Sequence, residues 1–132
     1  MELNDIYDKD RKLTGKVHRR GTHWKAGEYG LVVCVWVYDG EGKVLLTKRA
    51  PEKSFGGTWE NTGGAARAGE NSLQAIAREV FEETGLTIHD PQLRAIVTFN
   101  FESPQPELVD WDVEYMFVYT CEQFSGDLVD VC

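Results

Sequence analysis

The sequence has few cysteines, few histidines and no long apolar run, and each shortage limits the class of protein. No apolar stretch approaches the roughly 20 residues that a helix needs to cross a bilayer. The first twelve residues, MELNDIYDKDRK, are polar and charged and lack the apolar segment of a secretory signal. The sequence therefore predicts a cytoplasmic protein with no membrane partner.

Only three cysteines are present, Cys34, Cys121 and Cys132. An odd number without paired spacing argues against a disulfide framework and against a zinc site. Cys34 and Cys121 fall in apolar, strand-like runs, where buried thiols are expected. A reducing cytoplasm suits such thiols.

Basic residues are absent from the last part of the chain, and the net charge is −8. No lysine or arginine follows Arg94, whereas seven of them crowd residues 9–25. The acidic balance disfavours stable binding to nucleic acid or to anionic membranes. The basic N-terminal region could attract a phosphorylated substrate or pair with the acidic C-terminal region, and the sequence leaves both interpretations open.

The most informative stretch runs from Gly63 to Leu86 and reads GGAARAGENSLQAIAREVFEETGL. Its centre has helical periodicity, with cap residues at Asn71, Ser72 and Gly85. On a helical wheel the apolar face expected toward a core consists of Leu73, Ile76, Ala77, Val80 and Thr84. The adjacent arc carries three carboxylates and two small residues: Glu79, Glu82, Glu83, Ser72 and Ala75.

Three carboxylates within five residues of one helix repel one another. Arg78 is the only cation nearby in the helix. Divalent cations would supply the missing positive charge, and oxygen ligands without histidine or cysteine suit Mg²⁺ or Mn²⁺. Such ions commonly join protein carboxylates to substrate phosphates. A solvated acidic face is the alternative for the carboxylate cluster taken alone.

The complete spacing of this stretch resembles the Nudix box, whose fixed positions are matched by Gly64, Glu70, Arg78-Glu79-Val80, Glu82-Glu83 and Gly85-Leu86. The resemblance implies a Mg²⁺-dependent hydrolase that cleaves the diphosphate linkage of a nucleoside diphosphate joined to another moiety. It implies that Glu79, Glu82 and Glu83 are metal ligands, together with the carbonyl of Gly64. Glu79, Arg78 and Glu83 form the expected catalytic set, with Glu79 as the first candidate for the general base. Arg78 and Glu70 are expected to brace the loop, and to pair with each other.

The rest of the chain alternates strand-like segments with turns, so the sequence predicts one domain, residues 1–132, of the mixed α/β (α+β) class. Strands are expected at 3–7, 13–17, 31–38, 43–48, 59–62, 86–88, 93–101 and 111–120, with a turn at 122–127 and a further strand at 128–132. The resemblance implies an α/β/α sandwich with a curved mixed sheet and a loop–helix–loop motif. A second helix, usual near the C-terminus of such domains, is not evident. Three explanations stay open: a shortened chain, a terminal edge strand, or cover from a second subunit in a homodimer.

Cationic and aromatic residues outside the box are candidates for binding a small-molecule diphosphate. Arg49 and Lys53 flank a glycine-containing loop and could contact phosphate. Trp59 could stack on a nucleobase, and so could Phe99, Phe101 and Trp111, although strand aromatics more often belong to a core. Nudix hydrolases often recruit a further carboxylate from a later loop, for which the candidates are Glu107, Asp110, Asp112 and Glu114.

The first segment, YDKDRKLTGKVHRRGTH, resembles the entry segment of isopentenyl-diphosphate isomerases, a branch of the same fold. That branch uses histidine metal ligands and a cysteine in the loop before the helix. Here the loop WENTGGAARAGE has no cysteine, and the REVFEE signature, from which the isomerases depart, is complete. His18, His23 and Trp24 are therefore expected at the surface or at the rim of a substrate site. Isomerase chemistry and a non-catalytic module that senses nucleotides or metabolites are the alternatives to hydrolysis.

Overall fold

The computed structural model describes residues 2–22, 24–52, 56–100 and 113–129. In chain order its elements are β1 (Leu3–Tyr7), β2 (Leu13–Arg19), β3 (Gly30–Val37), β4 (Thr47–Lys48), β5 (Trp59–Glu60), β6 (Thr62–Ala65), α1 (Ser72–Thr84), β7 (Thr87–His89), β8 (Gln92–Asn100), β9 (Val113–Cys121) and β10 (Gln123–Ser125). This order confirms the predicted mixed α/β class. No helix in these ranges is long and apolar enough to span a membrane.

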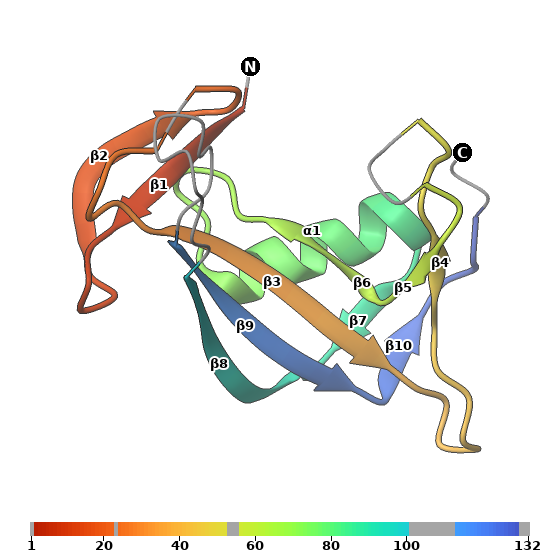
Figure 1. Ribbon diagram of the computed structural model, residues 1–132. Helices are drawn as coiled ribbons and strands as arrows, with labels where there is room; N and C mark the ends of the chain where they lie inside the picture. The colour runs from red at the N-terminus through yellow and green to blue at the C-terminus, as the bar shows by residue number, and fades with distance from the viewer. Residues whose placement is uncertain (1, 23, 53–55, 101–112, 130–132) are drawn as a thin grey trace.

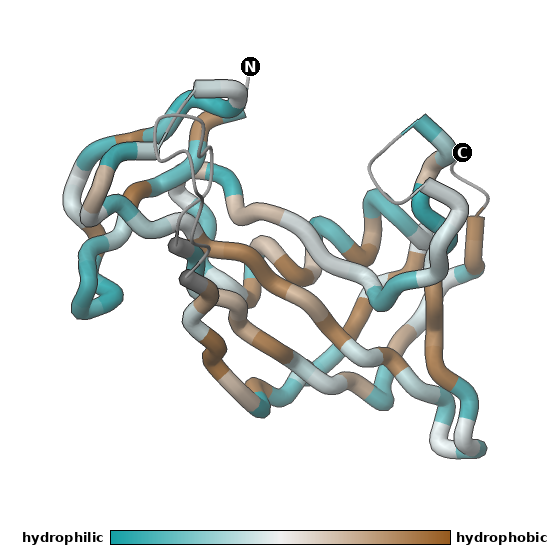
Figure 2. Tube along the Cα trace, viewed as in Figure 1, coloured by the Kyte–Doolittle hydropathy of each residue, from teal (hydrophilic) through white to brown (hydrophobic). Residues whose placement is uncertain are grey.

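The main sheet has the strand order β6-β3-β9-β8 and is mixed, because β3 pairs parallel with β9 while the other two pairings are antiparallel. The sequence of β3 is rich in β-branched residues, which favour a pleated, buried strand. Figure 2 shows the apolar character of β3 along its length. Its alternate side chains face the helix and are buried: Leu31, Val33, Val35 and Val37. Figure 1 shows α1 lying across that face of the sheet.

The boundaries of α1 follow from its sequence. Asn71 is the N-cap and forms a capping box with Gln74, since each side chain accepts a hydrogen bond from the other residue's backbone N–H. Gly85 ends the helix with φ of 82°, a left-handed conformation that glycine adopts at low cost. The predicted cap residues Asn71 and Gly85 are therefore confirmed.

The buried side of α1 differs from the predicted one. Ile76, Val80 and Thr84 are buried as expected, but Leu73 is 50% exposed and Ala75 is fully buried. The helix packs against β6 and β3, and a small residue at position 75 permits close approach of the two backbones. At the N-terminal end of α1 burial therefore falls on Ala75, about 160° from Leu73 on the wheel, because close packing against the sheet and not periodicity decides which residue is covered.

The strands outside the main sheet form short pairs. The β1–β2 hairpin is antiparallel, as predicted. The expected strand at 43–48 is only partly present: Val44 bridges Tyr38, whereas Thr47–Lys48 pairs with β5. The segment 122–127, expected as a turn, contains β10, which pairs with β7. That pairing joins residues more than 30 positions apart, so local sequence preference does not show it.

Of the strand predicted at 128–132, Leu128 and Val129 lie outside any strand, and 130–132 lie outside the described residues. On the side of the sheet away from α1, Trp36 is 43% exposed. No second helix occurs in the described ranges.

Candidate active site

The glycine pair of the box lies in β6 and brings the first carboxylate of the helix against the sheet. Strand pairing places Gly64 opposite Val33. A Cβ atom at Gly64 would stand only 2.6 Å from Oε1 of Glu79 and 2.7 Å from its Cδ. The carboxylate of Glu79 therefore packs directly against the Gly64 backbone, and only glycine leaves room for it.

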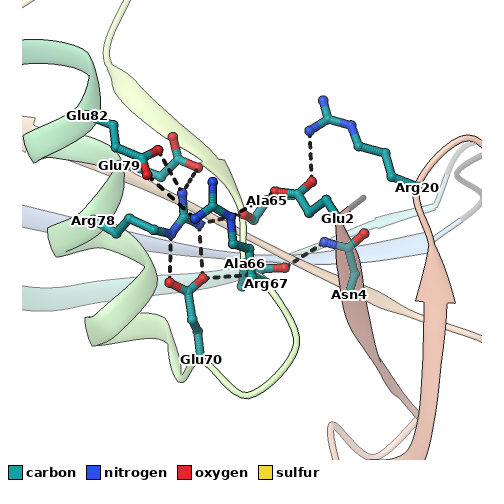
Figure 3. Close-up of polar contacts among 10 residues, drawn as sticks. All are labelled: Glu2, Asn4, Arg20, Ala65, Ala66, Arg67, Glu70, Arg78, Glu79 and Glu82. Atoms are coloured by element: carbon teal, nitrogen blue, oxygen red, sulfur yellow. Dashed lines mark hydrogen bonds and ion pairs between the residues drawn. The ribbon is translucent and has the colours of Figure 1, made fainter.

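Arg78 is the central cation of the site (Figure 3). Its Nε and Nη2 donate to the two carboxylate oxygens of Glu70 at 2.7 and 2.9 Å. Its Nη1 donates to Glu79 at 2.9 Å and to Glu82 at 3.2 Å. Its Nη2 also donates to the carbonyl of Ala65 at 3.1 Å. One guanidinium thus connects the loop, the end of β6 and the acidic face of α1, and the expected pairing of Glu70 with Arg78 is confirmed.

The two carboxylates that share Arg78 have opposite pKa shifts. The side-chain hydrogen bonds from Arg78 hold the pKa of Glu70 below its usual value, with a further contribution from the backbone N–H of Arg67. Burial raises the pKa of Glu79, and this effect outweighs the opposing influence of Arg78. Glu79 is therefore a stronger base than an exposed glutamate, whereas Glu70 is a weaker one.

The other two helix carboxylates are less constrained than Glu79. Glu82 has a 46% exposed side chain and lies 3.6 Å from Nη1 of Arg67, while Glu83 is half-buried. Within the described ranges no group of three acidic, histidine or cysteine side chains converges as a metal site would. Arg78 accounts for this arrangement, because it draws Glu79 and Glu82 toward its own nitrogens. The donor set of carboxylates and a glycine carbonyl nevertheless fits a hard divalent cation.

The N-terminal strand holds the loop between β6 and α1, a role that the sequence analysis missed. The backbone N–H of Ala68 donates to the carbonyl of Leu3 at 2.7 Å. The backbone N–H of Gly69 donates to Oδ2 of Asp5 at 2.8 Å. Asn4 is buried, and its amide donates to a loop carbonyl at 2.7 Å. The available signal was a polar residue on the same strand face as the apolar Ile6, although its partner lies 62 residues away.

Glu2 completes this link between the hairpin and the loop. It accepts from Arg67 at 3.3 Å and from Arg20 at 2.8 Å. Figure 3 shows Glu2 between these two arginines, with Arg67 adjoining the Arg78 cluster. The N-terminal strand therefore reaches the edge of the candidate active site.

Arg49 and Trp59 are the predicted substrate-binding residues outside the box that the structure describes. Arg49 forms an ion pair with Glu60 at 3.3 Å. Trp59 is 64% exposed, with the ammonium of Lys48 lying 5.8 Å from its ring. Figure 1 places β4 and β5 near the C-terminal end of α1, away from the β1–β2 hairpin. Lys53 lies outside the described residues, and the substrate contacts of all three stay predictions.

His18 was expected at the surface or at the rim of a substrate site, and the surface position is wrong, because the residue is only 8% exposed. Its ring stacks on Trp24 with centroids 3.8 Å apart, and its Nε2 donates to the carbonyl of Thr22 at 2.7 Å. The indole lies in turn over Gly30, where a Cβ atom would stand 3.3 Å from it. Packing of the hairpin on the end of β3 explains this burial. His23 lies outside the described residues.

The remaining candidates are divided between described and undescribed positions. Cys121 is buried as expected, whereas Cys34 is only half-buried. Among the four candidates for a further carboxylate only Glu114 is described, in β9, and burial raises its pKa. Phe99 lies in β8. The others lie outside the described residues: Phe101, Glu107, Asp110, Trp111, Asp112 and Cys132.

The fold and the glycine–carboxylate–arginine arrangement define a Nudix-type domain, and comparison with known proteins agrees. The NUDIX domain family matches residues 28–131. The chain therefore belongs to the Nudix family, which confirms the resemblance in the sequence.

Three similar proteins illustrate the relationship. The uncharacterized Nudix hydrolase lin0387 of Listeria innocua is 39% identical over 105 residues, covering 78% of this chain and 62% of that protein. The isopentenyl-diphosphate Delta-isomerase of Halorhodospira halophila is 30% identical over 120 residues, covering 89% of this chain and 67% of that protein. The crystal structure of the MutT protein of Bacillus halodurans superposes with a TM-score of 0.61 and 27% identity, covering 76% of this chain and 60% of that chain. The chain thus spans less than two thirds of the Listeria protein.

Proposed function

We propose that this protein hydrolyses the diphosphate linkage of a nucleoside diphosphate joined to another moiety. The observation that carries the proposal is the carboxylate of Glu79, packed against Gly64 and hydrogen-bonded to Arg78. Glu79, Glu82, Glu83 and the carbonyl of Gly64 would hold Mg²⁺, or Mn²⁺ in its place. Family membership supports the assignment, because a domain of this family would act on pyrophosphate bonds.

The described residues have different roles in such a reaction. When bound, the divalent cation would neutralise the diphosphate and lower the pKa of a water molecule. Glu79 accepts the proton of the attacking water, since burial raises the pKa of its carboxylate toward that of an effective general base. Arg78 keeps Glu79 and Glu82 in place, and Glu83 adds negative charge for the cation. Attack at phosphorus then depends mainly on positioning and charge stabilisation.

Isopentenyl-diphosphate isomerisation is the second candidate, because an alignment covering 89% of the chain connects it to an isomerase. That coverage includes part of the β1–β2 hairpin, where the sequence resemblance to isomerases lies. The segment from Trp59 to Gly69 contains no cysteine, however, and β6, which lies within it, has Gly63 and Gly64. Hydrolysis is therefore the favoured function.

An assay with Mg²⁺ that follows release of the monophosphate products by chromatography, across nucleotide and isoprenoid diphosphates, tests the proposal. We expect release from at least one nucleotide substrate, and strong loss of release in Glu82→Gln. Glu41→Gln serves as the matched control, because Glu41 is an exposed glutamate in the turn after β3. NMR analysis of products from isopentenyl diphosphate separates the two candidates, since robust double-bond isomerisation would favour the isomerase.

Thermal unfolding gives an independent measurement of the metal site. Mg²⁺ or Mn²⁺ should raise the melting temperature of the wild type, because a ligand of the folded state stabilises it by mass action. Glu82→Gln and Glu83→Gln should reduce that shift, and Glu41→Gln should retain it. Equal shifts in all four proteins would overturn the assignment of the metal ligands.

A further inference from the structure

A cavity of about 380 Å³ lies where the β1–β2 hairpin meets the ends of β3 and β9. This volume falls within the range of about 300–1,000 Å³ typical of small-molecule sites. Strand residues with small or apolar side chains line part of it, namely Gly30, Val32 and Ala65. Trp24 and Glu114 line it as well. The cavity therefore combines apolar strand surface with a carboxylate.

The cavity adjoins the candidate active site through two shared residues. Ala65 lines the cavity, and its carbonyl accepts from Arg78. Glu2 also lines it and accepts from Arg67, which in turn lies 3.6 Å from Glu82. A ligand with its phosphates near Glu79 and Glu82 could extend its remaining part into this cavity.

The charges around the cavity disfavour phosphate. It is lined by two carboxylates, Glu2 and Glu114, and by one arginine, Arg20. Glu2 already pairs with Arg20 at 2.8 Å, so that cation is largely neutralised. The cavity suits an uncharged part of a ligand that donates hydrogen bonds.

Two acceptors in the lining have no donor among the described residues and point to the same chemistry. Glu114 is half-buried and makes no hydrogen bond or ion pair with another described residue, so the partial loss of its hydration is not offset by a donor. Nε2 of His18 must donate to the carbonyl of Thr22, which leaves Nδ1 as an acceptor in the neutral ring. This Nδ1 is buried and has no hydrogen-bond partner among the described residues. Donors on a ligand would satisfy the acceptor at Glu114 without any rearrangement of charge.

The shape of the lining favours a planar group over a rounded cation. An alkylammonium ligand is best held by several open aromatic faces. Here the indole of Trp24 is stacked on His18 on one side and lies against Gly30. The paired strand residues Val32 and Ala65 offer instead an apolar contact for a heterocycle.

We propose that this cavity binds the nucleobase of the substrate and that Glu114 selects bases with an exocyclic amino group. The inference rests on the proposed function, whose substrates carry a nucleoside. A carboxylate accepts well from the amino group of cytosine. It repels the carbonyl oxygen that replaces this amino group in uracil, and the same contrast separates adenine from hypoxanthine.

Paired substrates that differ only at this group test the inference. Hydrolysis of cytidine against uridine nucleotides, and of adenosine against inosine nucleotides, is compared at the same phosphate tail. The wild type should prefer the amino partner by roughly 10-fold or more in kcat/KM, the scale of one good base contact. Glu114→Gln should bring the ratio close to one, because an amide can donate or accept. Glu114→Asp, which keeps the carboxylate, should retain a preference of the same sign, and Glu41→Gln should leave it unchanged.

Calorimetric binding of nucleoside monophosphates without metal makes the test independent of hydrolysis. Preferential binding of the amino bases that Glu114→Gln abolishes would support the cavity assignment even if no substrate were hydrolysed. Hydrolysis without amino preference in the wild type would overturn the cavity assignment and leave the proposed function standing. An unchanged preference in a folded Glu114→Gln variant would also overturn it.

Discussion

Glu70, in the loop before α1, and Glu79, in the middle of α1, both accept hydrogen bonds from the guanidinium of Arg78. Glu70 receives two N–H groups from Arg78 and the backbone N–H of Arg67, and its pKa is lowered. Glu79 receives one N–H from Arg78 while it packs against Gly64, and its pKa is raised. The hydrogen bonds from Arg78 therefore outweigh the effect of burial on the pKa of Glu70 but not on that of Glu79.

The surroundings of the two carboxylates extend this contrast. In the loop, successive backbone N–H groups of Arg67, Ala68 and Gly69 all have acceptors. The loop is therefore held in place by the protein's own groups. The acidic face of α1 carries more negative charge than Arg78 neutralises, which is the condition that favours recruitment of a cation.

Replacing Glu79 with glutamine should remove the more basic of the two carboxylates and have the largest effect. Turnover should fall by roughly 100-fold or more, the scale of a lost general base. The metal-free melting temperature should rise, because the raised pKa shows that burial of the charged form costs stability. Turnover on the best substrate and thermal unfolding in EDTA provide the measurements. A stability loss with turnover intact would place Glu79 among the structural residues.

Replacing Glu70 with glutamine should have the opposite pattern. Its charge-assisted hydrogen bonds suggest a loss of about 1–3 kcal/mol in the free energy of unfolding at pH 7. Turnover should fall less than in Glu79→Gln, because the loop loosens while the acidic face of α1 is unchanged. Urea unfolding of both variants, with Glu41→Gln as control, makes the comparison direct.

The pH dependence gives Glu70 a second, sharper signature. Its folded-state pKa is lowered, so its stabilising contribution is present above the unfolded-state pKa and is lost as pH falls through the folded-state pKa. The stability difference between wild type and Glu70→Gln should therefore be full at neutral pH and shrink below about pH 4, near the ordinary value for glutamate. A difference independent of pH would show that the carboxylate charge is not what matters.

The sequence predicted the parts of this site that depend on local spacing. Helical periodicity placed Glu79 and Glu82 on one arc, and cap chemistry located Asn71 and Gly85 at the helix ends. It did not predict the burial of Ala75 or the exposure of Leu73, because the wheel places Leu73 in the middle of the apolar face and Ala75 on the carboxylate arc, and tertiary packing overrides that periodicity.

Long-range contacts were the other part that local spacing could not supply. The anchoring of the loop by Asn4 and Asp5 joins residues more than 60 positions apart. The burial of His18 depends on Trp24 and on packing of the hairpin against Gly30. In each case the residue type is visible in the sequence, but its partner is fixed only by the tertiary fold.

The smallest expected effect concerns Asp5, whose Oδ2 accepts from the backbone N–H of Gly69 at 2.8 Å. Asp5→Ala should lower the free energy of unfolding by about 1 kcal/mol, the net value of such a hydrogen bond. The effect stays modest because the contact is exposed and water can replace the carboxylate. Asp5→Asn keeps an acceptor and should recover most of the loss, whereas Asp10→Ala, in the exposed β1–β2 turn, should have almost no effect.

Turnover of the same variants shows whether the hydrogen bond from Gly69 to Asp5 serves stability alone or also the reaction. If β1 acts only by holding the loop, Asp5→Ala should lose stability in urea and only a few-fold in turnover. A large loss of turnover at unchanged stability would mean that the position of the loop, and not its anchoring, limits the reaction. The N-terminal strand would then contribute to the reaction itself, and not only to the stability of the loop before α1.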